Sequence, residues 1–279
     1  MPIKVSYFIM VLIWSTTPLG IVWSSDTVSP TLAVLLRMLV GNKNACLLYF
    51  YSSIGIFGGM LLSYMAAKTV PSGIISLMFG LAPILSGLLA QQLLNEPKFS
   101  AIKLIALTCA LIGLYFVSYN QIKHSQTQGL GLLYVFIAVC FFSLSGVMIK
   151  RVKIAIHPMA TTFGALVFVT PLFFIAWLLL DGELNIQNWS AKSIWAIGYL
   201  GVFGSLLGAL AYFHVLQNLN ASTVALTTLI TPSFALGLGA WLNNEPLSKE
   251  LISGAVIILL SLGVFQFGEQ IVNRNKQKI

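Results

Sequence analysis

The sequence predicts an all-α membrane protein that crosses the bilayer many times. Of its 279 residues, 58% are hydrophobic and only 8% are charged, whereas ordinary soluble domains carry roughly 25% charged residues. So few charges could not cover the surface of a soluble protein of this size. The chain also contains a series of apolar runs of about 20 residues, the length at which a helix spans a hydrocarbon core of about 30 Å.

The apolar runs are predicted to be helices, because backbone in lipid must satisfy its own hydrogen bonds and these runs are too long for barrel strands. The long runs cover residues 5–24, 45–67, 74–94, 101–119, 130–149, 159–180, 193–217, 222–242 and 251–272. A further run, Pro30 to Val40, is short and contains Arg37. We interpret the first run as a span rather than a signal peptide, because it lacks an A-x-A-like cleavage site.

A long-period repeat divides the chain into two halves. Gly80 to Pro97 and Leu229 to Pro246 both carry an early proline, an apolar stretch and then Asn-Glu-Pro. Pro83 pairs with Pro232, and the two Asn-Glu-Pro triplets pair at the same offset in the numbering. Such self-similarity fixes the architecture before any local prediction. We therefore predict repeats at residues 1–120 and 129–272, separated by a polar stretch.

The first helices repeat at a shorter offset. Trp14 pairs with Phe142, and Ser15 with Ser143. The first half is therefore shorter than the second by the difference between the two offsets, and the missing segment falls somewhere between Arg37 and Ser63. We therefore expect a second helix truncated to about half of its length. It is either a short helix that thins the bilayer locally or a re-entrant piece buried against its neighbours.

Charge placement favours ten helices with both termini in the cytoplasm. That topology puts ten Lys or Arg residues inside and four outside, whereas a nine-helix assignment gives nine against five. Both obey the positive-inside rule, and ten helices fit it better. Five helices per half is an odd number, so the halves would lie inverted to each other. Inverted repeats are typical of secondary transporters whose substrate site lies near the midplane.

Several motifs resemble the EamA-type transporters of the drug/metabolite transporter superfamily. They are Ile13 to Pro18 (IWSTTP), Pro30 with Leu36-Arg37, Pro71-Ser72-Gly73 with Pro83 and Asn95-Glu96-Pro97, and the second-half copy from Ala221-Ser222 through Pro232 to Asn244-Glu245-Pro246. The resemblance covers nearly the whole chain. It implies a ten-helix carrier of two EamA repeats in a bacterial inner membrane, which moves small metabolites or amphipathic compounds, often outward. It also implies a central cavity lined by the first, third and fourth helices of each half.

Five residues of the first and third helices are candidates for substrate binding. Trp14, Ser15 and Ser143 occupy equivalent positions in the two first helices. Paired hydroxyls across a pseudo-two-fold axis would suit a polar substrate group, and simple helix–helix hydrogen bonding is the alternative. Tyr64 and Tyr212 belong to the third helices and could line a cavity, with an interfacial aromatic belt as the alternative.

Four further residues are singled out by their chemistry. His214 could bind substrate or carry a proton, because imidazole titrates near neutrality; a packing histidine is the alternative. Arg37 is a functional candidate because charge inside a membrane is expensive, and snorkelling to the headgroups is its alternative. Pro83 and Pro232 are each expected to free a carbonyl inside a helix. They are predicted bending points, with tolerated kinks as the alternative.

No enzyme motif is present, so no catalytic residue, metal or cofactor is expected. Glu96 and Glu245 are expected to cap helices or to pair locally. The expected partners are a small-molecule substrate and membrane lipid, with no nucleic acid. Transport coupled to a proton or sodium gradient and facilitated diffusion are both open as mechanisms. The sequence thus predicts an alternating-access secondary transporter, an exporter of small metabolites, amino acids or amphipathic compounds. The alternative is a non-transporting remnant or interaction protein with a damaged first repeat.

Overall fold

All regular secondary structure in the described residues is helical, as the apolar runs predict. The structure is a computed structural model, and it describes residues 3–24, 51–124, 126–151, 158–184, 186–208, 211 and 227–276. The predicted second helix with Arg37 lies outside these residues, as do Tyr212 and His214. In chain order the elements are α1 (Ile3–Ser24), η1 (Gly55–Gly59), α4 (Met60–Ala66), α5 (Ser72–Phe79), α6 (Ala82–Leu93), α7 (Ala101–His124), α8 (Gln126–Arg151), α9 (Pro158–Leu180), η2 (Ile186–Asn188), α10 (Ala191–Tyr199), η3 (Leu200–Leu207), α13 (Thr227–Asn243) and α14 (Lys249–Lys276).

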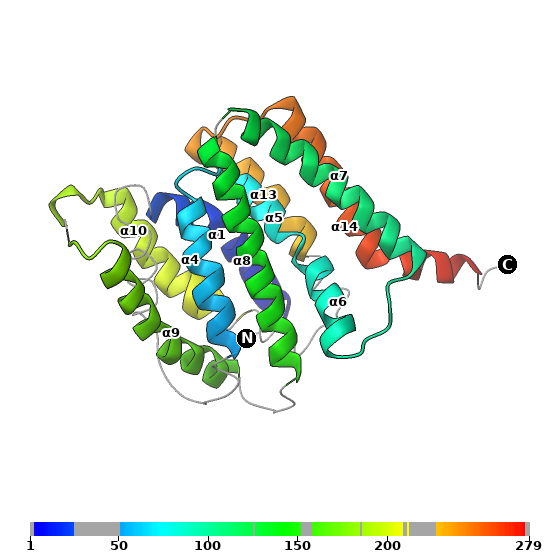
Figure 1. The fold of residues 1–279 in the computed structure, drawn as a ribbon, viewed down its shortest axis with the longest axis horizontal. Coiled ribbons are helices and arrows are strands. Elements are labelled where there is room, and N and C mark those ends of the chain that lie inside the picture. The colour runs from blue at the N-terminus through cyan, green and yellow to red at the C-terminus, as the bar shows by residue number, and fades with distance from the viewer. Residues whose placement is uncertain are drawn as a thin grey trace.

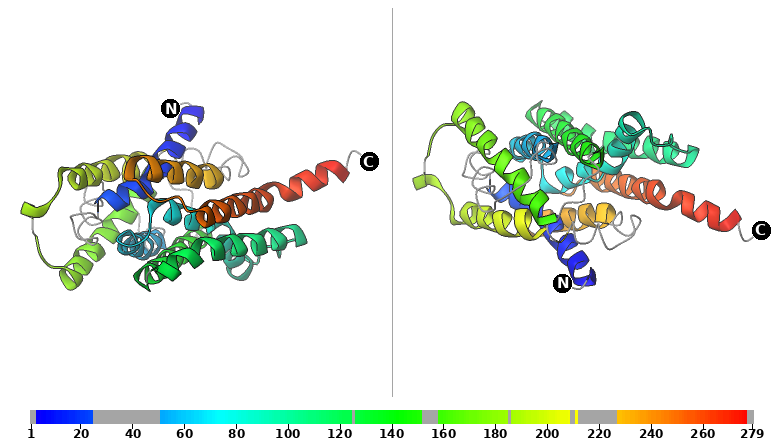
Figure 2. Two further views of the ribbon diagram at one scale, coloured as in Figure 1. Left: turned by 90° about the horizontal axis from the view of Figure 1, so that it is seen from above. Right: turned by 90° about the horizontal axis from the view of Figure 1, so that it is seen from below.

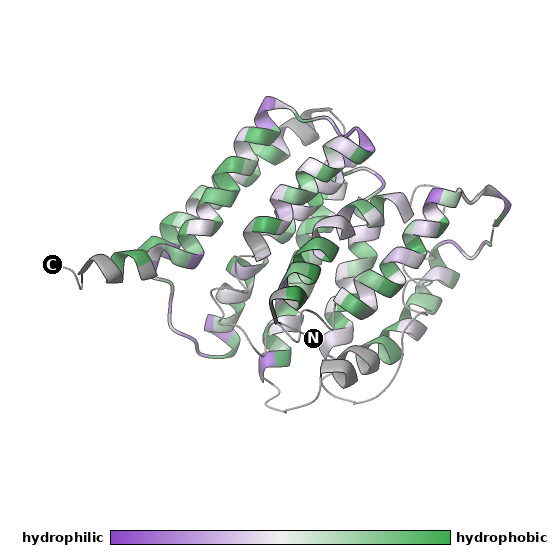
Figure 3. Ribbon diagram, turned by 180° about the vertical axis from the view of Figure 1, so that it is seen from behind, coloured by the Kyte–Doolittle hydropathy of each residue, from purple (hydrophilic) through white to green (hydrophobic). Residues whose placement is uncertain are grey.

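Within these ranges, five helical stretches are long and apolar enough to cross a membrane. They are Tyr7–Ser24, Ser72–Leu93, Ala101–Tyr119, Thr127–Lys150 and Lys249–Glu269. Hydrophilic residues gather at helix ends and connecting loops, while the helix bodies are largely hydrophobic (Figure 3). Large apolar side chains such as Leu179 and Trp195 are 79% exposed, which suits contact with lipid. The chain therefore has the fold class of an all-α polytopic membrane protein.

The first helix of each predicted half packs among helices of the other half. The helix α8 lies along η1 and α4 and also contacts α5 and α6, all of the first half (Figure 1). The helix α1 packs on α10, η3 and α13 of the second half. Figure 2 shows the blue helix α1 running in among the other helices, with its N-terminal end projecting beyond them. The two halves are thus interlocked rather than side by side.

Equivalent glycines make this interlocking possible. The third helix of each half contains a π-helical stretch, η1 in the first and η3 in the second. Gly59 and Gly208 are related by the same offset as the paired prolines. A Cβ on Gly59 would overlap the ring of Phe142; one on Gly208 would lie 3.0 Å from the Phe203 carbonyl oxygen and 3.1 Å from Ile13 Cγ2 of α1, with Trp14 Nε1 at 3.6 Å. Because Trp14 and Phe142 are themselves a predicted pair, both contacts set a glycine against the first-helix aromatic of the other half.

The fourth helix of the first half is interrupted, although the sequence predicts one continuous span from Ile74 to Leu94. Gly80 and Leu81 separate α5 from α6. Pro83 therefore lies in the first turn of α6, where a missing N–H has no intrahelical partner to lose. Its counterpart Pro232 lies inside the continuous helix α13. A Cβ on Gly80 would lie 3.4 Å from the Pro232 ring, so the break in the first half faces the proline of the second.

The two Asn-Glu-Pro segments end their helices in the same way. Asn95 and Asn244 have φ angles of 52° and 51°, in the left-handed region that asparagine tolerates at helix ends. In each copy the glutamate N–H donates to a carbonyl six residues earlier, that of Ala90 at 3.3 Å or Gly239 at 3.1 Å. The two copies therefore share one backbone geometry at the predicted offset.

We expect Gly59→Ala and Gly208→Ala each to destabilise the fold by about 1–3 kcal/mol, because the added methyl group overpacks a tight helix crossing. The measurement is the Tm of the detergent-solubilised protein. Gly263→Ala is the matched control, since a Cβ there meets nothing within 4 Å. Its Tm should stay level or rise, because alanine is the better helix former. Unchanged Tm values for Gly59→Ala and Gly208→Ala would contradict the close crossing.

Candidate functional site

Six buried polar side-chain atoms have no hydrogen-bond partner in the part of the chain that the structure describes. They are Tyr7 Oη, Tyr64 Oη, Ser72 Oγ, Trp177 Nε1, Thr227 Oγ1 and Thr231 Oγ1. All but Trp177 belong to α1, α4, α5 and α13, and α1 contacts each of the other three helices. A buried donor or acceptor left without a partner costs about 1–3 kcal/mol. This unpaired polar set lies at several levels of the helices, and each of its members is a candidate for contact with a bound ligand or water that would complete its hydrogen bonds.

Tyr64 is the sequence-predicted site residue that belongs to the unpaired polar set. Its side chain is completely buried on α4, and its hydroxyl has no partner among the described residues. Residues of an interfacial aromatic belt sit at headgroup level, in contact with lipid and water. The burial of Tyr64 therefore fits an inward-facing role and not a belt.

Ser15 and Ser143 are both buried, and each hydroxyl bonds within the protein. Ser15 Oγ donates to the Val11 carbonyl of its own helix at 2.7 Å. Ser143 Oγ donates to the Ala82 carbonyl at the start of α6, at 3.3 Å. The hydroxyls do not bond to each other in this structure. Ser143 makes the kind of helix–helix hydrogen bond that was the alternative to substrate binding.

Trp14 is half-buried on α1 and faces the second half of the chain. It packs around Met10 and Ala211, next to Gly208. Farther along the same helix, the hydroxyls of Thr16 and Tyr199 hydrogen-bond to each other and tie α1 to α10. This pair could not be predicted, because no local sequence pattern relates two residues that are 183 positions apart.

A polar network at one end of the bundle was also not predicted. Trp23 Nε1 donates to Asn243 Oδ1 at 2.8 Å, and Asn243 Nδ2 donates to Glu245 Oε1 at 3.2 Å. The ammonium group of Lys192 lies 4.6 Å from the centre of the Trp23 ring. Ser193 Oγ donates to the Trp23 carbonyl at 2.9 Å. The ends of α1 and α13 and the start of α10 are joined here.

Two ion pairs lie at the opposite end of the helices. Lys150 Nζ is 2.6 Å from Glu96 Oε1, and Lys103 Nζ is 3.0 Å from Glu269 Oε2. Glu269 is near the end of α14. The start of α14 follows the end of α13, where Asn243 bonds to Trp23. The two lysines thus lie at the end of the bundle away from Lys192.

These features define a polytopic helical membrane protein with interlocked halves and buried, unpaired polar groups. Residues 129–266 match the profile of the EamA-like transporter family. A solved crystal structure superposes with a TM-score of 0.65 at 17% identity, covering 94% of this chain and 95% of that one. At that identity the likeness concerns the fold alone.

Curated relatives align over most of the chain. The Bacillus subtilis protein named uncharacterized transporter YdfC is 23% identical, over 92% of this chain and 88% of its own. An uncharacterized transporter of Buchnera aphidicola is 25% identical over 97% of both chains, and Protein PagO of Salmonella typhimurium is 26% identical over 94% and 91%. These matches confirm the resemblance to EamA-type transporters, and they support the general class of a membrane transporter.

We expect Tyr64→Phe to leave the Tm unchanged or to raise it, because the substitution removes a buried hydroxyl that has no partner among the described residues. Tyr199→Phe is the matched comparison. It should lower stability by about 0.5–1.5 kcal/mol, since it removes the hydroxyl that bonds to Thr16. Thermal unfolding of the two variants in the same detergent measures the difference. A lower Tm for Tyr64→Phe would show that its hydroxyl is already satisfied.

Proposed function

We propose that this protein is a secondary transporter that exports small metabolites, amino acids or amphipathic compounds across the inner membrane by alternating access. The observation that carries the proposal is the unpaired polar set on α1, α4, α5 and α13. These are parts of the first, third and fourth helices of the two halves, which the family resemblance implies as cavity-lining. A substrate with polar groups would supply the missing hydrogen bonds.

The chemistry of these helices supports an amphipathic or amino-acid-like substrate. Tyr64 and Thr231 offer hydroxyls that can donate or accept, and the half-buried Trp14 offers an apolar aromatic face. A few convergent polar groups on a mainly apolar lining are typical of small-molecule sites. Tyr212 and His214 remain substrate-binding residues predicted from the sequence.

A secondary mechanism is supported by the sequence, which contains no P-loop or other ATP-binding motif. The energy source would then be a proton or sodium gradient, or the gradient of the substrate itself. Alternating access requires one set of helices to move against the other. The break between α5 and α6, which faces Pro232, provides a bending point for that movement.

The alternative function is that of a non-transporting membrane protein whose first repeat is damaged. The segment that the first half lacks relative to the second favours it. The breadth of the comparisons favours transport, because the two relatives named transporters align over 92% and 97% of the chain. The position of Ser25, just beyond α1, separates the two functions, since it reports whether the short second segment crosses the membrane.

The test of transport is substrate flux in proteoliposomes over a panel of metabolites and amphipathic compounds. We expect flux by the unmodified protein, and about 3–10-fold less flux from Tyr64→Phe, the value of one lost hydrogen bond. Tyr212→Ala and His214→Ala should also reduce it. The matched control is Tyr119→Phe, because Tyr119 is exposed on α7. Equal flux from Tyr64→Phe and Tyr119→Phe would remove Tyr64 from the site.

For the topology, we expect a Ser25→Cys variant, with Cys46, Cys109 and Cys140 replaced, to be labelled from outside by a membrane-impermeant thiol reagent. That result places the end of α1 outside and requires the second segment to return across the membrane. Labelling from the cytoplasmic side alone would give nine helices. Together with an absence of flux for the whole panel, it would favour the non-transporting alternative.

A further inference from the structure

Glu245, in the second Asn-Glu-Pro segment, binds the beginning of a helix in the other half of the chain. Its Oε1 accepts the backbone N–H of Ser72 at 3.0 Å, and its Oε2 accepts that of Gly73 at 3.2 Å. The amide of Asn243 also donates to Oε1, at 3.2 Å. One carboxylate therefore joins the end of α13 to the start of α5, across 172 residues of sequence.

Glu245 supplies what the first turn of α5 lacks. The first N–H groups of a helix have no intrahelical partner, and the dipole makes that end positive. The N–H groups of Ile74 and Ile75 both donate to the Pro71 carbonyl, at 3.1 Å. Those of Ser72 and Gly73 depend on Glu245. Hydrogen bonds to a charged acceptor are about twice as strong as neutral ones, so this contact holds α5 firmly against α13.

Because Gly239 has no side chain, the Glu245 carboxylate can lie against the α13 backbone. A Cβ on Gly239 would overlap Glu245 Oε2 and lie 2.8 Å from Ser72 Oγ. The equivalent position in the first half is Ala90, which has that Cβ. The two copies of the motif therefore differ at a position where, in the second copy, a Cβ would overlap the carboxylate.

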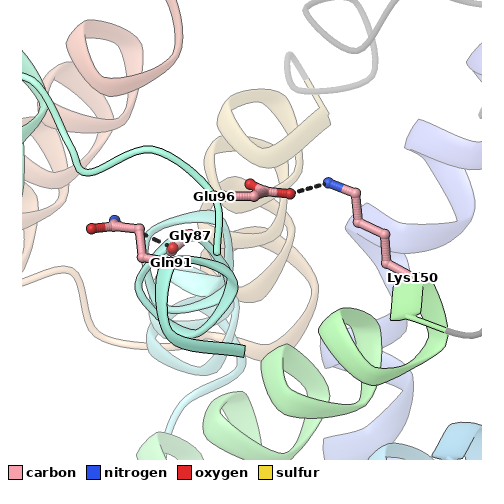
Figure 4. Close-up of polar contacts among 4 residues, drawn as sticks. All are labelled: Gly87, Gln91, Glu96 and Lys150. Carbon is pink, nitrogen blue, oxygen red and sulfur yellow. Dashed lines mark hydrogen bonds and ion pairs between the residues drawn. The ribbon is translucent and has the colours of Figure 1, made fainter. Parts of the chain in front are cut away.

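The first-half glutamate indeed has a different partner. Glu96 forms an ion pair with Lys150 at 2.6 Å, and both side chains are substantially exposed. Figure 4 shows the Glu96 carboxylate turned away from α6, toward the end of α8, while Gln91 bonds to Gly87 within α6. The two segments share a backbone geometry, yet Glu96 pairs with a lysine side chain and Glu245 binds the start of a helix.

We propose that Glu245 is a latch that closes one end of the transport pathway by holding α5 on α13, and that it releases when this end opens. The proposal rests on the alternating-access function proposed above. Ser72 Oγ is buried beside the latch without a partner among the described residues, so the closed state carries a cost that opening relieves. A contact of this kind can alternate between two states.

The rest of α5 is built to move with the latch. Gly73 lies against Leu236 of α13, where an added Cβ would be 2.6 Å from Leu236 Cδ2. At its other end α5 stops at the break formed by Gly80 and Leu81. The eight residues of α5 therefore lie between a latch and a hinge. Release of Glu245 lets α5 separate from α13 without unfolding α6.

The test uses spin labels at Lys68→Cys and Leu247→Cys, with Cys46, Cys109 and Cys140 replaced, in the full-length protein in lipid nanodiscs. Both positions are exposed, one before α5 and one after α13. Electron–electron double resonance then measures the distance between the two helix ends without any substrate. We expect one short distance in the parent protein. Glu245→Ala and Gly239→Ala should each raise the ratio of long to short distances about tenfold, the effect of losing a charged hydrogen bond.

The matched controls are the equivalent changes in the first half, Glu96→Ala and Ala90→Gly, which should leave this distance unchanged. An unchanged distance in Glu245→Ala and Gly239→Ala would overturn the latch, and so would equal changes in the controls. Flux is measured on the same variants. A transporting parent with no distance change refutes the latch alone, whereas a parent without flux refutes the transport function and the role of the latch in it. Gly239→Ala displaces the Glu245 carboxylate while keeping its charge, so agreement between the two variants shows that the contact and not the charge alone sets the distance.

Discussion

The structure depends on one constraint: backbone polar groups inside a membrane must be satisfied by the protein itself. Continuous helices meet it automatically, and each interruption has a specific remedy. At the start of α5 the acceptors are the Glu245 carboxylate and the Pro71 carbonyl. At the start of α6 a proline removes one donor, and the Leu81 carbonyl accepts two others. Buried hydroxyls such as that of Ser63 bond back to their own helix. Against this background, hydroxyls without partners stand out as places for a ligand.

Close packing in lipid is obtained with small residues, because there is no hydrophobic force between helices there. Gly59 and Gly208 bring the third helix of each half onto the first helix of the other half, and Gly239 lets a carboxylate lie against its own helix. Glycine therefore has two roles in this chain. It allows helices of the two halves to pack closely, and it makes room for the Glu245 contact that joins α13 to α5. The equivalent position in the first half is Ala90, and there the glutamate of the motif pairs with Lys150 instead.

Much of the fold could be predicted because its signals are long or repeated. Apolar runs predicted the helices, and Asn95 and Asn244, which the repeat offset pairs, have nearly the same positive φ. The site was less predictable. The equivalence of Ser15 and Ser143 in sequence says nothing about which way each hydroxyl turns, and each bonds elsewhere. The break at Gly80 and Leu81 lies just before Pro83, where the sequence predicted a bending point.

The sequence by itself determined the membrane environment, the helical class, the internal repeat and the EamA resemblance, since composition and periodicity encode these directly. Only the tertiary structure decided which partners the repeated residues take. Glu96 and Glu245 stand in identical triplets, yet one binds Lys150 and the other the start of α5. The physical reason is that hydrogen bonds and packing act over a few ångströms. Distances of that size are set by how distant segments of the chain cross.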